Sequence, residues 1–294
     1  MNQAAYEWLV DEPMLHEPVM VVMLTGWIDA AGAAEAAART VADACNASPI
    51  LRFDDDTFID FRARRPTLEL RDGVNTNLVW STLEMSAGRT PGGDDILLLT
   101  GPEPDMAWHA FGRAVVDLAV SCGVRQMIAF GAYPFAAPHT RSPQIAVSSP
   151  STDVIGALPF ARSSVDVPAG VAATLEHALH AKRIPTLGLW VQVPHYVSGM
   201  PYPASTVALL EGFELVTGIR IDSGELQREV ASQRNRIDQI VDANDEHVAM
   251  VRQLEEIYDS TVGDEGDEPA DEELEMRSGD ELAAEIQRFL RDQD

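Results

Sequence analysis

Four apolar segments with strand character, each followed by a segment with helical spacing, constrain the fold of this 294-residue chain more than any other feature. Nearly unbroken apolar runs are typical of strands that are covered on both faces. The predicted strands are Val19–Leu24, Ile96–Thr100, Arg125–Phe130 and Thr186–Val193, and the predicted helices are Ala30–Cys45, Met106–Cys122, Pro168–Arg183 and Pro203–Thr217. This alternation predicts an α/β domain over residues 1–220, with a mostly parallel sheet flanked by helices.

One stretch breaks the pattern. The segments Leu51–Arg62 and Thr67–Trp80 alternate over short runs, and the second contains Arg71-Asp72-Gly73. Aspartate followed by glycine between such runs is a strong signal for a tight β-hairpin. We expect an antiparallel excursion here, at the edge of the sheet.

Residues 221–258 change to purely helical spacing and are predicted to form a helical appendage. As one helix this stretch would be about 50 Å long. It either breaks near Asp242-Ala243-Asn244-Asp245 into a helical hairpin, which we favour, or packs against another subunit. Residues 259–280 are predicted to be an acidic linker, and residues 281–294 a short terminal helix that docks on the body or binds a partner.

Charge and composition exclude several classes of protein. The formal net charge is −26, which argues against a general nucleic-acid binder and against docking on an anionic membrane. No apolar run approaches the roughly 20 residues of a membrane span, and no signal peptide is expected at the start of the chain. Two cysteines, Cys45 and Cys122, rule out a disulfide framework, so the expected compartment is the reducing cytoplasm.

Polar and aromatic residues follow each predicted strand of the sheet. Ligands bind beyond the carboxyl ends of parallel strands, because loops from several strands meet there. A histidine beside a carboxylate can transfer protons near neutral pH, and an arginine can orient an anion. The candidate binding pocket collects Trp27, Asp29, Glu103, Asp105, Tyr133, His139, Arg141, His195 and Tyr196.

Each of these residues also has a structural interpretation. Asp29 and Asp105 are placed to cap the helices that follow them. Trp27 suits a core position, the two histidines suit structural hydrogen bonds, and Arg141 suits an ion pair within the protein.

Known catalytic templates are missing. The chain has no GxxxxGK[ST] or GxGxxG loop for nucleotides, no HExxH and no GxSxG. We therefore predict no catalytic residues, no metal site and no cofactor, and leave open whether the protein is an enzyme.

Five motifs in order resemble one family. They are Gly26-Trp27-x-Asp29-Ala30, Asp60-x-Arg62-x-Arg64-Arg65-Pro66, Gly101-x-Glu103-Pro104-Asp105-x-x-Trp108, Pro138-His139-Thr140-Arg141 and Pro194-His195-Tyr196. Over roughly residues 18–258 the chain resembles the proteasome assembly chaperone two family, and within it the uncharacterised actinobacterial branch.

The resemblance implies a nucleoside-phosphorylase-like α/β body, a helical C-terminal appendage and homo-oligomers, with trimers expected. Family members bind proteasome subunits, some through a C-terminal hydrophobic-Tyr-any motif, but here Gln293 stands at the penultimate place. Docking on a proteasome through that motif is therefore not expected. Two hypotheses follow: a non-catalytic protein-binding or assembly-chaperone-like protein, and alternatively a binder or enzyme of a nucleoside, phosphate or carboxylate.

Overall fold

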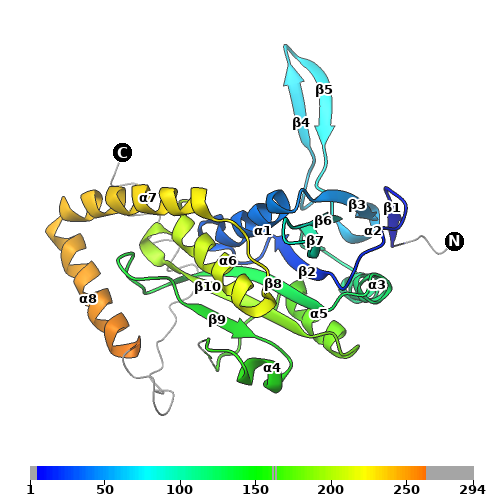
Figure 1. The fold of residues 1–294 in the computed structure, drawn as a ribbon. Coiled ribbons are helices and arrows are strands. Elements are labelled where there is room, and N and C mark those ends of the chain that lie inside the picture. Colours follow the sequence, from blue (N-terminus) through cyan, green and yellow to red (C-terminus); the bar gives the residue numbers. More distant parts are fainter. Residues whose placement is uncertain (1–4, 161, 163, 263–294) are drawn as a thin grey trace.

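An eight-stranded mixed sheet forms the centre of the computed structural model, which describes residues 5–160, 162 and 164–262 (Figure 1). The strand order is β1-β3-β6-β7-β2-β8-β10-β9. The strands are β1 (Tyr6–Trp8), β2 (Val19–Thr25), β3 (Ser48–Phe53), β6 (Glu84–Arg89), β7 (Asp95–Pro102), β8 (Gln126–Phe135), β9 (Ile145–Ser148) and β10 (Thr186–Pro194).

The four strands predicted from apolar runs form the parallel centre of the sheet. β7, β2, β8 and β10 pair parallel to one another, whereas β6, β3 and β1 on one side and β9 on the other pair antiparallel. The predicted α/β class with a mostly parallel sheet is confirmed. β8 extends to Phe135, five residues beyond the predicted strand end, because its pairing with β10 continues through Pro134 and Phe135.

Helices cover both faces of the sheet. α1 (Ala33–Ala44) and α6 (Pro203–Thr217) pack on one face, and α3 (Trp108–Ser121) and α5 (Val171–His180) on the other. Side chains of β2 alternate between the two cores: Val19, Val21 and Met23 face α1 and α6, while Met20 and Val22 face α3 and α5. Burial on both sides explains why this strand has no polar residue in its buried part. Short elements complete the chain: the helical turns η1 (Ala30–Gly32) and η2 (His195–Val197), and the helices α2 (Asp55–Phe58) and α4 (Thr152–Gly156).

The predicted hairpin is present, but it does not lie at the edge of the main sheet. β4 (Thr67–Arg71) and β5 (Val74–Val79) form a separate two-stranded sheet that projects away from the body (Figure 1). Asp72 and Gly73 make its turn with φ angles of +51° and +79°, as the primed turns of tight hairpins require. None of the other described strands pairs with either edge of this hairpin, so the expectation that it would join the edge of the main sheet is wrong.

The appendage consists of α7 (Gly224–Asp242) and α8 (Asp245–Val262). The helix breaks at Ala243 and Asn244, where the break was predicted, but α8 turns away from α7 at a corner and does not fold back along it (Figure 1). α8 is held by polar contacts with the body, which are described below. It continues past residue 258 to Val262, and the predicted acidic linker beyond it and the terminal helix lie outside the described residues. None of the helices in the described ranges is both long and apolar enough to cross a membrane.

Candidate functional site

Eight of the nine candidate residues lie beyond the carboxyl ends of β2, β7, β8 and β10, and Tyr133 lies within β8, near its carboxyl end. Because these strands are parallel, their ends share one edge of the sheet. Two contacts tie the loops at this edge together. Asp29 forms an isolated bridge with Ala132 of β8, and the backbone N–H of Ala31 donates to the carbonyl of Ser198 at 2.9 Å.

Trp27, Glu103 and Asp105 form a first cluster, at the ends of β2 and β7. Glu103 Oε1 accepts from the backbone N–H of Val171 at 2.5 Å, which ties the end of β7 to the start of α5. A side-chain carbon at Gly170 would lie 3.0 Å from Glu103 Oε1 and 3.1 Å from the Trp27 ring, so only glycine fits there without a shift. Trp27 is 45% exposed, so its predicted core position is wrong.

Arg64 completes this first cluster, and our prediction from the sequence missed it. Its Nε donates to both oxygens of Asp105, at 3.0 and 3.1 Å. Its guanidinium also covers Gly26, where a side-chain carbon would come within 2.8 Å of Nη2. Asp105 therefore binds Arg64 and accepts from the Asp60 N–H. The prediction that Asp105 caps α3 is wrong. The motif Asp60-x-Arg62-x-Arg64 was the available signal, but three arginines in four residues gave no way to choose among them.

Asp29 caps the alanine-rich helix, as predicted. Its carboxylate accepts from the N–H groups of Ala34 and Glu35, at 2.9 and 3.1 Å. Burial raises the pKa of Asp29, and these backbone hydrogen bonds oppose the rise. Tyr133 lies one residue past the bridged Ala132, and burial raises the pKa of its hydroxyl.

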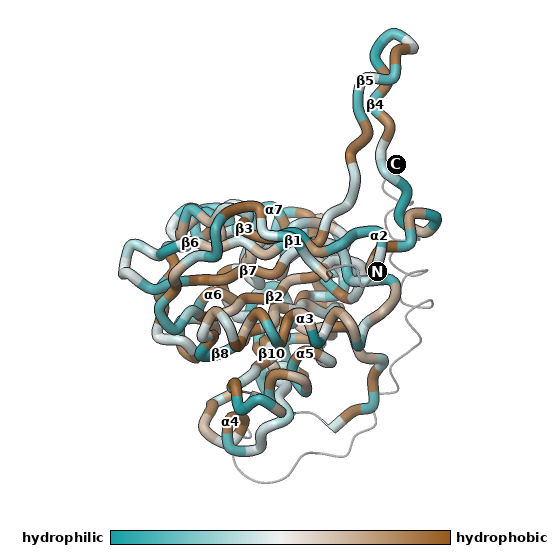
Figure 2. Tube along the Cα trace, turned by 90° about the vertical axis from the view of Figure 1, so that its right-hand side faces the viewer, coloured by the Kyte–Doolittle hydropathy of each residue, from teal (hydrophilic) through white to brown (hydrophobic). Residues whose placement is uncertain are grey.

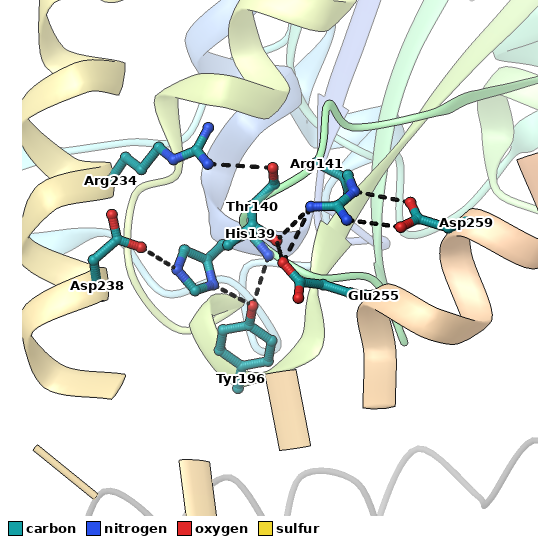
Figure 3. Close-up of polar contacts among 8 residues, drawn as sticks. All are labelled: His139, Thr140, Arg141, Tyr196, Arg234, Asp238, Glu255 and Asp259. Carbon is teal, nitrogen blue, oxygen red and sulfur yellow. Dashed lines mark hydrogen bonds and ion pairs between the residues drawn. The ribbon is translucent and has the colours of Figure 1, made fainter. Parts of the chain in front are cut away.

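A second cluster consists of His139, Arg141, His195 and Tyr196. Figure 3 shows His139, Arg141 and Tyr196 between the two helices of the appendage, and His195 packs against Tyr196. The Tyr196 hydroxyl accepts from the backbone N–H of His139 at 2.7 Å and lies 2.7 Å from its Nδ1. His139 Nε2 lies 2.9 Å from Asp238 Oδ1 of α7. The network fits the tautomer in which Nε2 carries the proton, donates to Asp238, and leaves Nδ1 to accept from Tyr196. The His195 ring stands edge-on to Tyr196, with 5.3 Å between ring centroids.

The chain Asp238–His139–Tyr196 has the order of a catalytic triad, and its groups are hydrogen-bonded to one another and to the backbone. His139 is only 5% exposed, and burial holds the pKa of Tyr196 well above its usual range. The Tyr196 hydroxyl already accepts the backbone N–H of His139, so it is engaged in holding the loop that carries His139. These three residues therefore join α7 to the body.

Arg141 fastens α8 in the same way. Its Nη2 and Nε donate to the carboxylate of Asp259 at 2.7 and 2.8 Å, and its Nη1 lies 3.1 Å from Glu255 Oε1. The paired guanidinium lowers the pKa of Asp259. Nearby, Gln144 donates to the Tyr258 hydroxyl of α8. Arg234 of α7 donates to the Thr140 carbonyl (Figure 3). The ion pair predicted for Arg141 as its structural role is present, with both of its carboxylates on the appendage.

A cavity of about 350 Å³ lies between α6, α7 and residues 139–143. Of the nine candidates only His139 and Arg141 line it, together with Tyr202, Arg234 and Ile237 among others. Burial raises the pKa of Tyr202 to about 12. A single pocket that gathers all nine residues stays a prediction. Within the described residues, no group of three His, Cys, Asp or Glu side chains is placed to hold a metal ion.

Comparison with solved structures finds close neighbours in actinobacteria. A protein of unknown function from Corynebacterium glutamicum is 30% identical, with a TM-score of 0.82 over 89% of this chain and 99% of its own. One of unknown function from Mycobacterium tuberculosis is 32% identical, with a TM-score of 0.81 over 90% and 94%. A proteasome-assembly chaperone homologue from M. tuberculosis is 29% identical, with a TM-score of 0.73 over 79% and 99%.

No curated protein matches the chain. The PAC2 family model, however, matches residues 23–241, which run from the end of β2 through most of α7 and include every candidate residue of both clusters. The chain belongs to the PAC2 family.

Proposed function

We propose that this protein binds other proteins in an assembly-chaperone-like role, without catalysis and as a homo-oligomer, in the cytoplasm. Its family and its 29% identity to a proteasome-assembly chaperone homologue support the protein-binding role. The two free, buried cysteines fit a reducing compartment. The trimer is the oligomer that we expect from the resemblance in the motifs.

The projecting β4–β5 hairpin carries this proposal. A two-stranded sheet on its own is marginally stable in water, and nothing in the described part of the chain adds a third strand to this one. Figure 2 shows the hairpin standing clear of the body with hydrophobic residues along both strands. Its apolar side chains are between 43% and 62% exposed: Leu68, Leu70, Val74, Leu78, Val79 and Trp80. An exposed apolar surface of this kind is typical of a site that another protein covers.

Charge favours a second copy of the chain as the occupant. Four of the 21 cationic residues, Arg62, Arg64, Arg65 and Arg71, lie between residues 60 and 72, in a protein of net charge −26. The same stretch holds three acids, Asp60, Glu69 and Asp72, so its net charge is only +1, and its positive charge lies in Arg62, Arg64 and Arg65, ahead of the hairpin. The base of the arm is therefore repelled less by an acidic body than the rest of the chain is, which favours contact between the arm of one copy and the body of another.

The alternative, a small-molecule site at the strand ends, has less support. The charged groups that would hold a ligand there are engaged by the protein itself: Asp105 by Arg64, Glu103 by Val171, and Arg141 by Asp259. A ligand would have to displace these contacts.

Affinity capture with two hairpin variants tests the protein-binding role. Leu68 and Leu78 face each other across the ribbon and are about half exposed, so replacing both with serine removes apolar surface without opening the core. We expect tagged full-length wild-type protein to retain untagged copies of this chain together with a defined set of proteins from native lysate, and the L68S/L78S variant to lose both.

The matched control replaces the neighbouring cross-strand pair, Glu69 and Asn77, with serine and should retain the same proteins. Identical capture by wild type and L68S/L78S would refute the proposal, as would turnover of a small molecule in the absence of any protein partner.

A further inference from the structure

A second cleft lies on the opposite flank of the sheet, at the base of the hairpin. Its volume is about 490 Å³, and it opens between β1, the segment after β3 and the chain that leaves β5. It is lined by Tyr6, Glu7, Arg52, Phe53, Asp54, Asp55, Asp56, Phe61 and Trp80. None of the nine candidate residues at the strand ends is among these.

Aromatic rings form the walls of this cleft. Phe61 and Trp80 stand edge to face with 4.7 Å between centroids, and Tyr6 meets Phe53 in the same way at 6.1 Å. Trp80 is 47% exposed. The faces of aromatic rings carry partial negative charge and attract cations.

Carboxylates form the rest of the lining. Asp54 and Asp55 are already engaged, by the Thr57 hydroxyl and the Leu83 N–H, whereas the side chains of Glu7 and Asp56 make no hydrogen bond or salt bridge with a described residue. The one cation among the lining residues, Arg52, is held by Glu84 at 2.8 Å, and the charge of Glu7 acts on it from a greater distance. The cleft therefore keeps two carboxylates without a salt bridge beside its aromatic walls.

We propose that this cleft binds the arginine side chain of a basic segment on a partner protein. A guanidinium group stacks on aromatic rings and donates pairs of N–H hydrogen bonds to carboxylates. It therefore matches both the aromatic walls and the acidic residues of the cleft. A metal ion fits less well, because no three ligating side chains converge among the described residues and the walls are apolar. This proposal rests on the proposed function, because it takes the partner of the cleft to be a protein. Peptide binding to the cleft is nevertheless measured separately from the capture of whole proteins.

Titration with short peptides tests this site. The probe is acetyl-Gly-Arg-Gly-amide, added to the full-length protein and followed by calorimetry at low salt. The neutral analogue with citrulline in place of arginine has nearly the same shape. We expect saturable binding of the arginine peptide, and binding of the citrulline peptide at least about tenfold weaker.

Variants locate the site on the protein. Trp80→Ala and Asp56→Asn should each weaken the arginine peptide several-fold, and Trp80→Phe should restore most of the affinity because it keeps an aromatic face. Asp72→Asn removes the same charge at the hairpin tip and should change nothing.

Equal affinity for the citrulline peptide, or unchanged affinity in Trp80→Ala, would overturn the proposal, as would the absence of saturation. Its failure is separable from that of the proposed function. If L68S/L78S still binds the arginine peptide but no longer captures proteins, both the proposed function and the arginine site are supported. If protein capture depends on the hairpin but the arginine peptide does not bind, only the arginine site is refuted.

Discussion

Replacing Glu176 with glutamine is expected to stabilise the protein by about 3 kcal/mol at pH 8.5. Glu176 lies on α5 and is 4% exposed. Both of its oxygens are 3.4 Å from the Ser148 hydroxyl, and no described cation pairs with it. Burial raises its pKa from 4.5 to about 7.

The direction of the pH effect follows from the raised pKa. The folded protein keeps a proton on Glu176 that the unfolded chain releases, so folding loses stability as the pH rises from about 4.5 to about 7. Glutamine cannot ionise and avoids this loss. Its advantage should therefore shrink to about 1 kcal/mol at pH 5.5, where the unfolded chain has released its proton and the folded state has not.

Urea unfolding at pH 5.5 and pH 8.5 measures this difference. The control is Glu229→Gln on the exposed side of α7, which should shift both midpoints by the same small amount. A Glu176→Gln variant that is equally stabilised, or destabilised, at both pH values would contradict the account of a buried and unpaired carboxyl.

Replacing Gly101 with alanine is expected to destabilise the protein by about 3 kcal/mol. Gly101 has φ of +127°, and a side-chain carbon there would lie 2.3 Å from the Thr82 carbonyl oxygen and 3.0 Å from Leu83 Cα. Both neighbours are backbone atoms, so the irregular segment that leads into β6 would have to move away from β7. The shift would also displace Glu103 from the Val171 N–H.

Gly123→Ala separates the collision from the backbone strain. Gly123 also has a positive φ, +67°, but nothing lies within 4 Å of the added carbon. The Gly123→Ala variant should lose only about 1 kcal/mol of unfolding free energy. Thermal or urea unfolding of both variants measures the two losses, and equal losses would show that close approach at Gly101 contributes nothing.

The parallel core of the fold was predictable from the sequence because its signal is local. In segments such as Val19–Leu24, consecutive apolar residues are enough to predict a buried strand. The turn is predicted by two neighbouring residues, Asp72 and Gly73, which tolerate the positive φ angles that it needs. β6 escaped prediction because Glu84–Arg89 has a single buried apolar side chain, Met85, and takes its strand form from β3 and β7 on either side.

The candidate site was predictable only as a location. That Trp27, Glu103, His139 and His195 share one sheet edge follows from the parallel topology, which the apolar runs reveal. The partners of His139 and Arg141 could not be predicted, because Asp238 of α7 and Asp259 of α8 lie 99 and 118 positions away along the chain. No local sequence pattern indicates such distant pairs. The same holds for Arg64, whose partner Asp105 is 41 positions away.

The central claim, that the projecting hairpin joins copies of this chain, is tested most directly by the mass of the protein in solution. Sedimentation equilibrium of the full-length protein should give a multiple of the 32.0 kDa chain mass, with three copies expected, and the L68S/L78S variant should sediment as one chain with an unchanged unfolding transition. A wild-type protein that sediments as a single chain at micromolar concentrations, or a variant that keeps the wild-type mass, would contradict the claim.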